Sequence, residues 1–152
     1  MLTRESRNLL QSVRSRPYGV GASEANIQTA EEQLGIKLPD SYKDFLKEFG
    51  WGGAGHLEFF GLGSDVPAHL DLVMVTLEER SLYRPYMLTY LVPLLNDGFG
   101  NHYCLDTRHI ESGDCPVVFW NHELDESQIP ELVAENYEKW LLDLLKHLQE
   151  QM

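Results

Sequence analysis

Apolar residues recur with the 3.6-residue period of a helix in three segments near the start of the chain. In the first segment, Leu9, Leu10 and Val13 form one stripe. Ser23 is a good N-cap for the second, and Gly35 stands where helices favour a terminating glycine. The three helices are predicted at residues 4–14, 24–34 and 40–49, the last with an apolar face of Tyr42, Phe45, Leu46 and Phe49.

The middle of the chain changes to short β-type segments separated by turn residues. One of these segments contains Pro93, so we expect this segment at the edge of a sheet or at a bulge. The turn chemistry of residues 96–101, Asn-Asp-Gly-Phe-Gly-Asn, predicts a hairpin between its two neighbouring segments. A capping box that begins at Thr76 predicts one brief helix, from Leu77 to Tyr83. The strands are expected at residues 57–60, 72–75, 91–95, 102–106 and 117–120.

The last segment is a long amphipathic helix, which we expect to have Pro130 in its first turn. Its apolar face is Leu132, Val133, Tyr137, Trp140, Leu141, Leu144, Leu145 and Leu148. Helices followed by short strands and a closing helix predict an α+β fold with a twisted, mostly antiparallel sheet of four to six strands. We expect a single domain over residues 1–152, with its core at 24–148 and residues 1–20 as a candidate extension.

The net charge narrows the classes of partner. The 152 residues include 24 Asp and Glu against 12 Lys and Arg, which gives a net charge of −12. A field of that sign repels phosphate backbones and anionic lipids, so direct binding of nucleic acid or a membrane is disfavoured and a basic partner is favoured. Simple solubility is the blander explanation of the same charge.

Hydropathy and cysteine usage indicate a compartment. No apolar run approaches the roughly 20 residues of a membrane-spanning helix, and the first residues are polar, unlike a signal peptide. Cys104 and Cys115 are the two cysteines, too few for a disulfide scaffold or a four-cysteine zinc site. We therefore expect a protein of the reducing cytoplasm.

Signals for a cofactor or a metal are weak. The glycines at residues 50–55 follow a predicted helix, whereas a phosphate loop lies between a strand and a helix, so we interpret them as a helix stop. His102, Cys104 and Asp106 alternate along one predicted strand and could present a metal. The same spacing suits an ordinary half-buried strand, which we favour. We expect no cofactor and no metal.

Signals for catalysis are equally weak. The pair Glu78-Glu79 could do acid–base chemistry only with a shifted pKa in a pocket, and such runs are usually solvated. A small hydrolase that uses His102 or His122 with Asp106 is the weakest alternative. We expect no enzyme and no catalytic residues.

An acidic segment at residues 121–128 joins the last strand to the closing helix and is expected on the surface. It holds Glu123, Asp125 and Glu126 beside the aromatic pair Phe119-Trp120. Charges speed the encounter with a basic protein, while buried aromatic side chains supply binding energy. The alternative is that these acids merely favour the dipole at the start of the closing helix.

Several segments, taken in order, resemble one known family. They are Ile27-x-x-Ala30-Glu31-x-x-Leu34-Gly35-x-x-Leu38-Pro39-x-x-Tyr42-x-x-Phe45-Leu46, Phe59-Phe60-Gly61-Leu62, Val92-Pro93-Leu94, residues 96–106, Pro116-Val117-Val118-x-Trp120-x-His122-Glu123 and Tyr137-x-x-Trp140-Leu141. Together they are similar to the SUKH superfamily, which groups fungal cell-wall-synthesis regulators with bacterial immunity proteins, and resemble its YobK-like immunity proteins. The family's Asn-Gly-Gly after the third helix is replaced here by Gly50-Trp51-Gly52-Gly53.

The resemblance implies a cytoplasmic antitoxin without catalytic residues. Such a protein binds the toxic C-terminal domain of a secreted polymorphic toxin, often an RNase or DNase, and we expect it to occlude the basic active-site groove. A non-catalytic scaffold or regulator of cell-wall or signalling partners is the alternative, and both a monomer and a homodimer are compatible with the sequence. From charge and aromaticity we select as candidate contacts Glu123, Asp125, Glu126, Asp97, Glu58 and Asp65, with Trp51 and Tyr103 as anchors.

Overall fold

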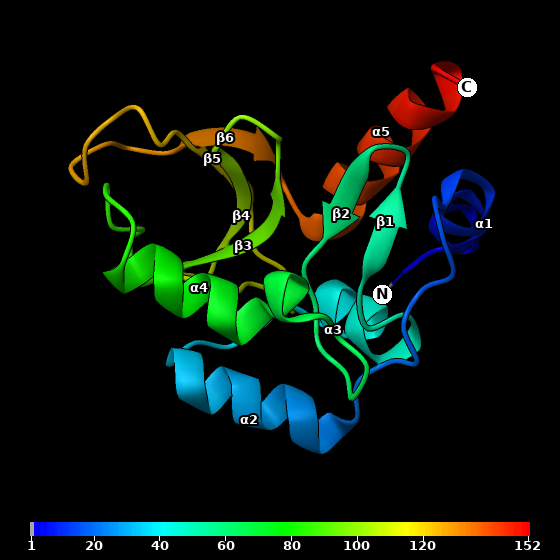
Figure 1. Ribbon diagram of the computed structural model, residues 1–152, viewed down its shortest axis with the longest axis horizontal. Coiled ribbons are helices and arrows are strands. Elements are labelled where there is room, and N and C mark those ends of the chain that lie inside the picture. The colour runs from blue at the N-terminus through cyan, green and yellow to red at the C-terminus, as the bar shows by residue number, and fades with distance from the viewer. Residues whose placement is uncertain (1) are drawn as a thin grey trace.

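Six short strands form two antiparallel sheets within residues 2–152, the part of the chain that the computed structural model describes. The larger sheet has the order β3-β4-β5-β6, and β1 pairs with β2 (Figure 1). All four strand pairings are antiparallel, as expected. The strands are β1 Gly52–Ala54, β2 Leu57–Phe59, β3 Leu91–Asn96, β4 His102–Asp106, β5 Val117–Trp120 and β6 Glu131–Ala134.

Five α-helices and one 3₁₀ turn pack around the sheets in the same described part of the chain. The first and last helices lie side by side although they come from opposite ends of the sequence, and α4 lies between the larger sheet and α2 (Figure 1). The helices are α1 Arg4–Val13, α2 Glu24–Leu34, α3 Asp40–Glu48, η1 Ala68–Leu70, α4 Leu72–Ser81 and α5 Tyr137–Glu150.

An aromatic cluster joins α3, α5 and β2 at the centre of the core. Phe45 of α3 is fully buried, and its ring centroid lies 5.8 Å from that of Phe59 and 5.6 Å from that of Phe49. The rings of Tyr42 and Tyr137 meet edge to face at 5.0 Å. Because edge-to-face pairs stabilise beyond the area they bury, this cluster fixes α3 and α5 relative to each other.

Local caps set the bounds of the first helices. The Thr3 hydroxyl accepts a hydrogen bond from the Ser6 N–H at 3.2 Å, and the Ser23 hydroxyl accepts one from the Asn26 N–H at 3.1 Å. Gly35 has a φ of 69° and ends α2 in the left-handed conformation. The predicted helices at 4–14, 24–34 and 40–49 are confirmed to within one residue.

Residues 72–75, expected as a strand, form the first turn of α4. Asp71 caps this helix, since its carboxylate accepts from the N–H groups of Val73 at 3.0 Å and Met74 at 3.3 Å. Thr76, the predicted cap, lies inside the helix, where its hydroxyl donates to the Leu72 carbonyl at 2.6 Å. The predicted strand was wrong, and the predicted helix exists but begins earlier, at Leu72, because a short β-branched run has the same pattern in a strand and in a buried helix.

The start of the closing helix was also predicted wrongly. Residues 131–134 form β6, in which Leu132 lies opposite Val118 of β5. Asn136 caps α5 instead, because its side chain accepts from the Lys139 N–H at 2.8 Å. The strand β1 was not predicted, since Gly52-Gly53 was interpreted as part of a helix stop.

The hairpin at residues 96–101 and the position of Pro93 are confirmed. Strand β3 is an edge of the larger sheet, and its register with β4 shifts between Pro93 and Leu95. A proline has no N–H to donate, so an edge strand with an irregular register is where it fits.

The α+β class is confirmed, with helices at the N-terminus and a closing helix at the C-terminus. No helix among residues 2–152 has the length and apolar character to cross a membrane. Cys104 and Cys115 are both buried and unpaired.

Truncation of the central aromatic cluster should destabilise the fold. We expect Phe45→Ala to lower the free energy of unfolding by about 3–5 kcal/mol, because it removes a ring from a close-packed core. The matched control is Phe99→Ala, since the Phe99 side chain is 81% exposed. Urea unfolding measures both, and equal losses for the two variants would contradict this description of the core.

Candidate partner-binding site

A groove of about 470 Å³ opens where α4, β2 and the turn between β3 and β4 meet. Four carboxylates line it, and no lysine or arginine does so among the described residues, so we call it the acidic groove. The carboxylates are Glu58, Glu78, Glu79 and Asp97. Three histidines, His56, His69 and His102, also line it. A cleft of this composition attracts positive charge.

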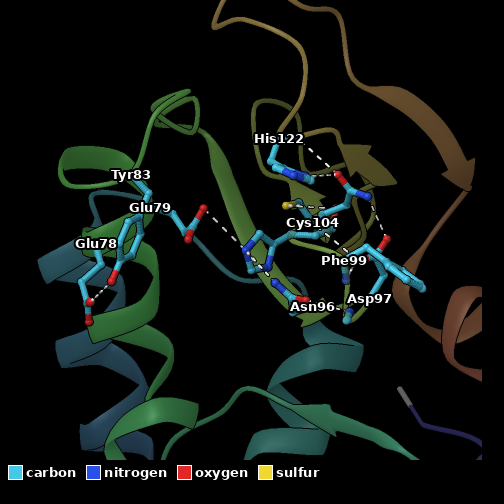
Figure 2. Close-up of polar contacts among 11 residues, drawn as sticks. Glu78, Glu79, Tyr83, Asn96, Asp97, Phe99, Cys104 and His122 are labelled. Carbon is cyan, nitrogen blue, oxygen red and sulfur yellow. Dashed lines mark hydrogen bonds and ion pairs between the residues drawn. The ribbon is translucent and has the colours of Figure 1, made fainter.

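Asp97 closes the hairpin turn, residues 96–101. Its carboxylate accepts hydrogen bonds from the N–H groups of Phe99 at 2.8 Å and Asn101 at 3.1 Å, and from the Asn101 side chain at 2.9 Å (Figure 2). Partial burial acts to raise the pKa of Asp97, but these hydrogen bonds outweigh it and hold the pKa below its ordinary value. The turn is therefore built around an ionised carboxylate.

Asn101 connects the hairpin turn to the acidic loop, residues 121–128. Its side-chain oxygen accepts from the His122 N–H at 3.1 Å and lies 2.7 Å from His122 Nδ1. Because its side-chain nitrogen also donates to Asp97, Asn101 brings Asp97 close to Glu123, the exposed residue after His122. Two of the candidate contacts thus lie at the same end of the larger sheet.

The acidic loop has internal hydrogen bonds of its own. The Ser127 side chain and N–H both donate to Asp125, which lowers the pKa of that exposed carboxyl group. Glu126 lies 3.6 Å from Arg84 Nη1, an exposed pair that links the loop to the segment after α4. Glu123 and Asp125 are exposed and Glu126 is partly exposed, so all three can meet a partner.

Arg16 contacts both Trp51 and Glu58, and Trp51 in turn contacts Asp65. The Trp51 indole N–H donates to Asp65 at 2.9 Å, and the Arg16 guanidinium lies 5.1 Å from the Trp51 ring centroid. Arg16 Nη2 is also 2.8 Å from the Glu58 carboxylate. Since Glu58 lines the acidic groove, this cluster borders it, although Arg16 offsets part of its negative charge.

Tyr103 lies apart from the other candidates. Neighbouring residues of a strand point to opposite faces, and His102 faces the acidic groove. The Tyr103 ring accordingly packs on the other face, with centroids 5.3 Å from Phe119 and 5.9 Å from Trp140. Tyr103 is partly buried, which raises the pKa of its hydroxyl and leaves only part of the ring free for a partner.

The pair Glu78-Glu79 is not the uniformly solvated run expected from the sequence. Glu78 accepts from the Tyr83 hydroxyl at 3.1 Å, whereas the Glu79 side chain is only 18% exposed and lies 3.5 Å from His102 Nε2. Sequence reasoning missed Glu79 because residues 72–75 were assigned to a strand. The signal that could have found it is Asp71, because an N-cap at this position starts the helix at Leu72 and so places Glu79 on a helix.

His102, Cys104 and Asp106 form no metal centre. Asp106 pairs with Arg108 at 2.8 Å, and within residues 2–152 no group of three or more His, Cys, Asp or Glu side chains is arranged to hold a metal. Burial raises the pKa of Cys104 and takes that of Cys115 to about 12. Both thiols are therefore protonated at neutral pH and poorly suited to nucleophilic attack.

Comparison with known proteins identifies a family and a relative that this chain resembles. A family model described as SUKH_5, SMI1-KNR4 cell-wall, matches residues 6–146. A relative in Bacillus subtilis (strain 168), the "SPbeta prophage-derived uncharacterized protein YokK", is 26% identical over 151 aligned positions, which cover 78% of this chain and 72% of the relative.

Loss of the Asp97 carboxylate should destabilise the protein in a pH-dependent way. We expect Asp97→Asn to lower the free energy of unfolding by about 1–2 kcal/mol at neutral pH, since hydrogen bonds to a charged acceptor are lost. The pKa of Asp97 lies below its ordinary 3.8, so the stability that the carboxylate adds over Asp97→Asn is complete at pH values above 3.8. This extra stability is lost as the pH falls through the lowered pKa.

Urea unfolding at neutral and acidic pH measures this difference. Asp143→Asn on the exposed face of α5 is the matched control and should have little effect at either pH. A wild-type advantage over Asp97→Asn that persists undiminished in acid would show that the carboxylate does not hold the turn.

Proposed function

The chain belongs to the SUKH family of SMI1-KNR4 cell-wall proteins, and from that premise we propose that it is an immunity protein. In this proposal it works in the cytoplasm of the toxin-producing cell. It binds the toxic C-terminal domain of a secreted polymorphic toxin, a nuclease, and covers the basic groove that holds RNA or DNA. It inhibits by shape and charge, without chemistry of its own.

The acidic end of the molecule is the observation that carries this proposal. The hairpin turn and the acidic loop are joined through Asn101, and the acidic groove beside them has no lysine or arginine among its described lining residues. A nuclease must carry positive charge to hold phosphates, so a protein with a net charge of −12 can compete for the same surface.

Exposed apolar side chains on the same segments supply the contact energy in this proposal. Phe99 at the tip of the hairpin turn is 81% exposed, and Leu124 in the acidic loop is 52% exposed. Acidic side chains around them steer the encounter, and burial of the apolar groups then slows dissociation. Phe99 and Leu124 therefore join Trp51, which is half-buried, as candidate anchors.

A non-catalytic scaffold for a cell-wall or signalling partner is the second candidate. The description of the matching family as cell-wall proteins favours it. A toxin gene next to the gene for this chain, and neutralisation of that toxin, distinguish immunity from scaffolding.

Charge reversal at the acidic loop should abolish protection. When the protein is co-expressed with the toxin domain encoded beside it, we expect Glu123→Lys with Glu126→Lys to lose cell survival and to slow association about tenfold. Asp125 is kept because its hydrogen bonds hold the loop. Glu32→Lys with Glu150→Lys makes the same change in net charge on exposed helical positions and should still protect. Full protection by the loop variant, or equal loss by both, would contradict the proposal.

The association rate should depend steeply on salt. Raising the ionic strength from about 0.015 M to about 0.15 M should slow association of the wild type with the toxin domain by tenfold or more, because screening shortens the reach of the acidic field. The dissociation rate should change little. Stopped-flow measurements give both rates, and an association rate independent of salt would remove electrostatic steering from the mechanism.

A further inference from the structure

Glu79 is the least satisfied carboxylate of the acidic groove. Asp97, Glu58 and Glu78 each have a hydrogen-bond or ion-pair partner within 3.1 Å. The Glu79 side chain is mostly removed from water, and its polar partner among the described residues is His102 Nε2 at 3.5 Å. A carboxylate in this state still has room to accept strong hydrogen bonds from a ligand.

His102 lines the same groove and carries an unpaired polar atom. The residue is 3% exposed, its ring lines the groove, and Nε2 faces Glu79 and Asn96. Its Nδ1 is buried and has no hydrogen-bond partner among residues 2–152. Unpaired buried polar atoms are uncommon in native proteins, and this one belongs to a residue that lines the acidic groove. Together with the Glu79 carboxylate, the His102 ring makes this part of the groove lining polar.

The residues that line the groove favour a ligand with a positively charged head on an apolar stem. Carboxylates exclude an anion, and within residues 2–152 no cluster of three metal-ligating side chains holds a metal ion. Phe60, Leu70 and Val75 supply an apolar wall beside Glu79. Lysine and arginine side chains combine an apolar stem with a charged head, so they match both parts of the lining.

We propose that the acidic groove receives one arginine side chain of the protein partner, with its guanidinium bonded to Glu79. This inference rests on the proposed function, since a basic nuclease groove is where such an arginine would come from. A guanidinium donates two parallel N–H bonds to one carboxylate, which an ammonium cannot do. Glu79 can accept this pair because, among the described residues, no lysine or arginine lies within ion-pairing distance of it, and its contact to His102 Nε2 is long at 3.5 Å.

A titration of the full chain with blocked arginine, N-acetyl-arginine amide, tests the groove without the toxin. In NMR spectra, we expect the chemical shifts of the His102 ring and of the backbone groups in the groove to change and to reach saturation as the ligand is added. Blocked citrulline has the same shape without the charge and should give no saturable shift. Blocked lysine should bind more weakly than arginine.

Glu79→Gln, nearly isosteric with the wild type, should weaken the binding of blocked arginine about tenfold, as expected for the loss of a charge-assisted pair. Glu150→Gln removes the same charge from the exposed end of α5 and should bind like the wild type. The comparison of arginine with citrulline uses the wild type alone, so it holds even if Glu79→Gln fails to fold.

Equal shifts with arginine and citrulline, shifts spread over the whole acidic surface, or binding unchanged by Glu79→Gln would overturn the inference. If arginine fails to bind but the protein still neutralises the toxin, the groove assignment is wrong and the proposed function stands. If arginine binds in the groove but no neighbouring toxin is neutralised, the proposed function is wrong and the arginine must come from another partner.

Discussion

The carboxylate of Asp97 holds together the end of the molecule on which binding depends. It accepts three hydrogen bonds within the hairpin turn, one of them from the Asn101 side chain, and Asn101 in turn holds the acidic loop through His122. The chain of contacts sets the position of Glu123 relative to the acidic groove. A surface made from three separate segments can be rigid only if such contacts join them, and rigidity limits the entropy lost when a partner binds.

The acidic groove differs from the packing of the termini because its least satisfied carboxylate, Glu79, lines a cleft that a partner can enter. Where α1 meets α5, one Glu138 oxygen accepts hydrogen bonds from the hydroxyls of Thr3 at 2.6 Å and Ser6 at 2.7 Å, and the other is buried with no partner among residues 2–152. In the groove, the mostly buried Glu79 has a single long contact to His102, which itself carries an unpaired nitrogen. A polar group that lacks hydrogen-bond partners in the free protein costs stability, and such groups are expected at functional sites. A binding partner can supply the missing hydrogen bonds.

Local signals predicted most elements, and tertiary contacts explain the failures. Ser23 and the turn at residues 96–101 act through neighbours in sequence, so α2 and the β3–β4 hairpin were predicted correctly. Residues 131–134 became a strand because β5 offers an edge to pair with, which no local pattern reveals. Recognising Asp71 as a cap would have placed Glu79 on a helix, but not beside His102, because the position of that strand next to α4 is decided by packing. The acidic loop could be recognised from its charge, but its connection to Asp97 through Asn101 could not.

Hydrogen exchange on the complex with the toxin domain gives the sharpest view of the binding surface. If the acidic end binds the toxin, the amides of the hairpin turn, the acidic loop and the groove-facing part of α4 should exchange more slowly in the complex, while those of α1 and α5 should be unchanged. Protection confined to α1 and α5, with the hairpin turn and the acidic loop exchanging as in the free protein, would place the partner on the opposite side and contradict the electrostatic basis of recognition.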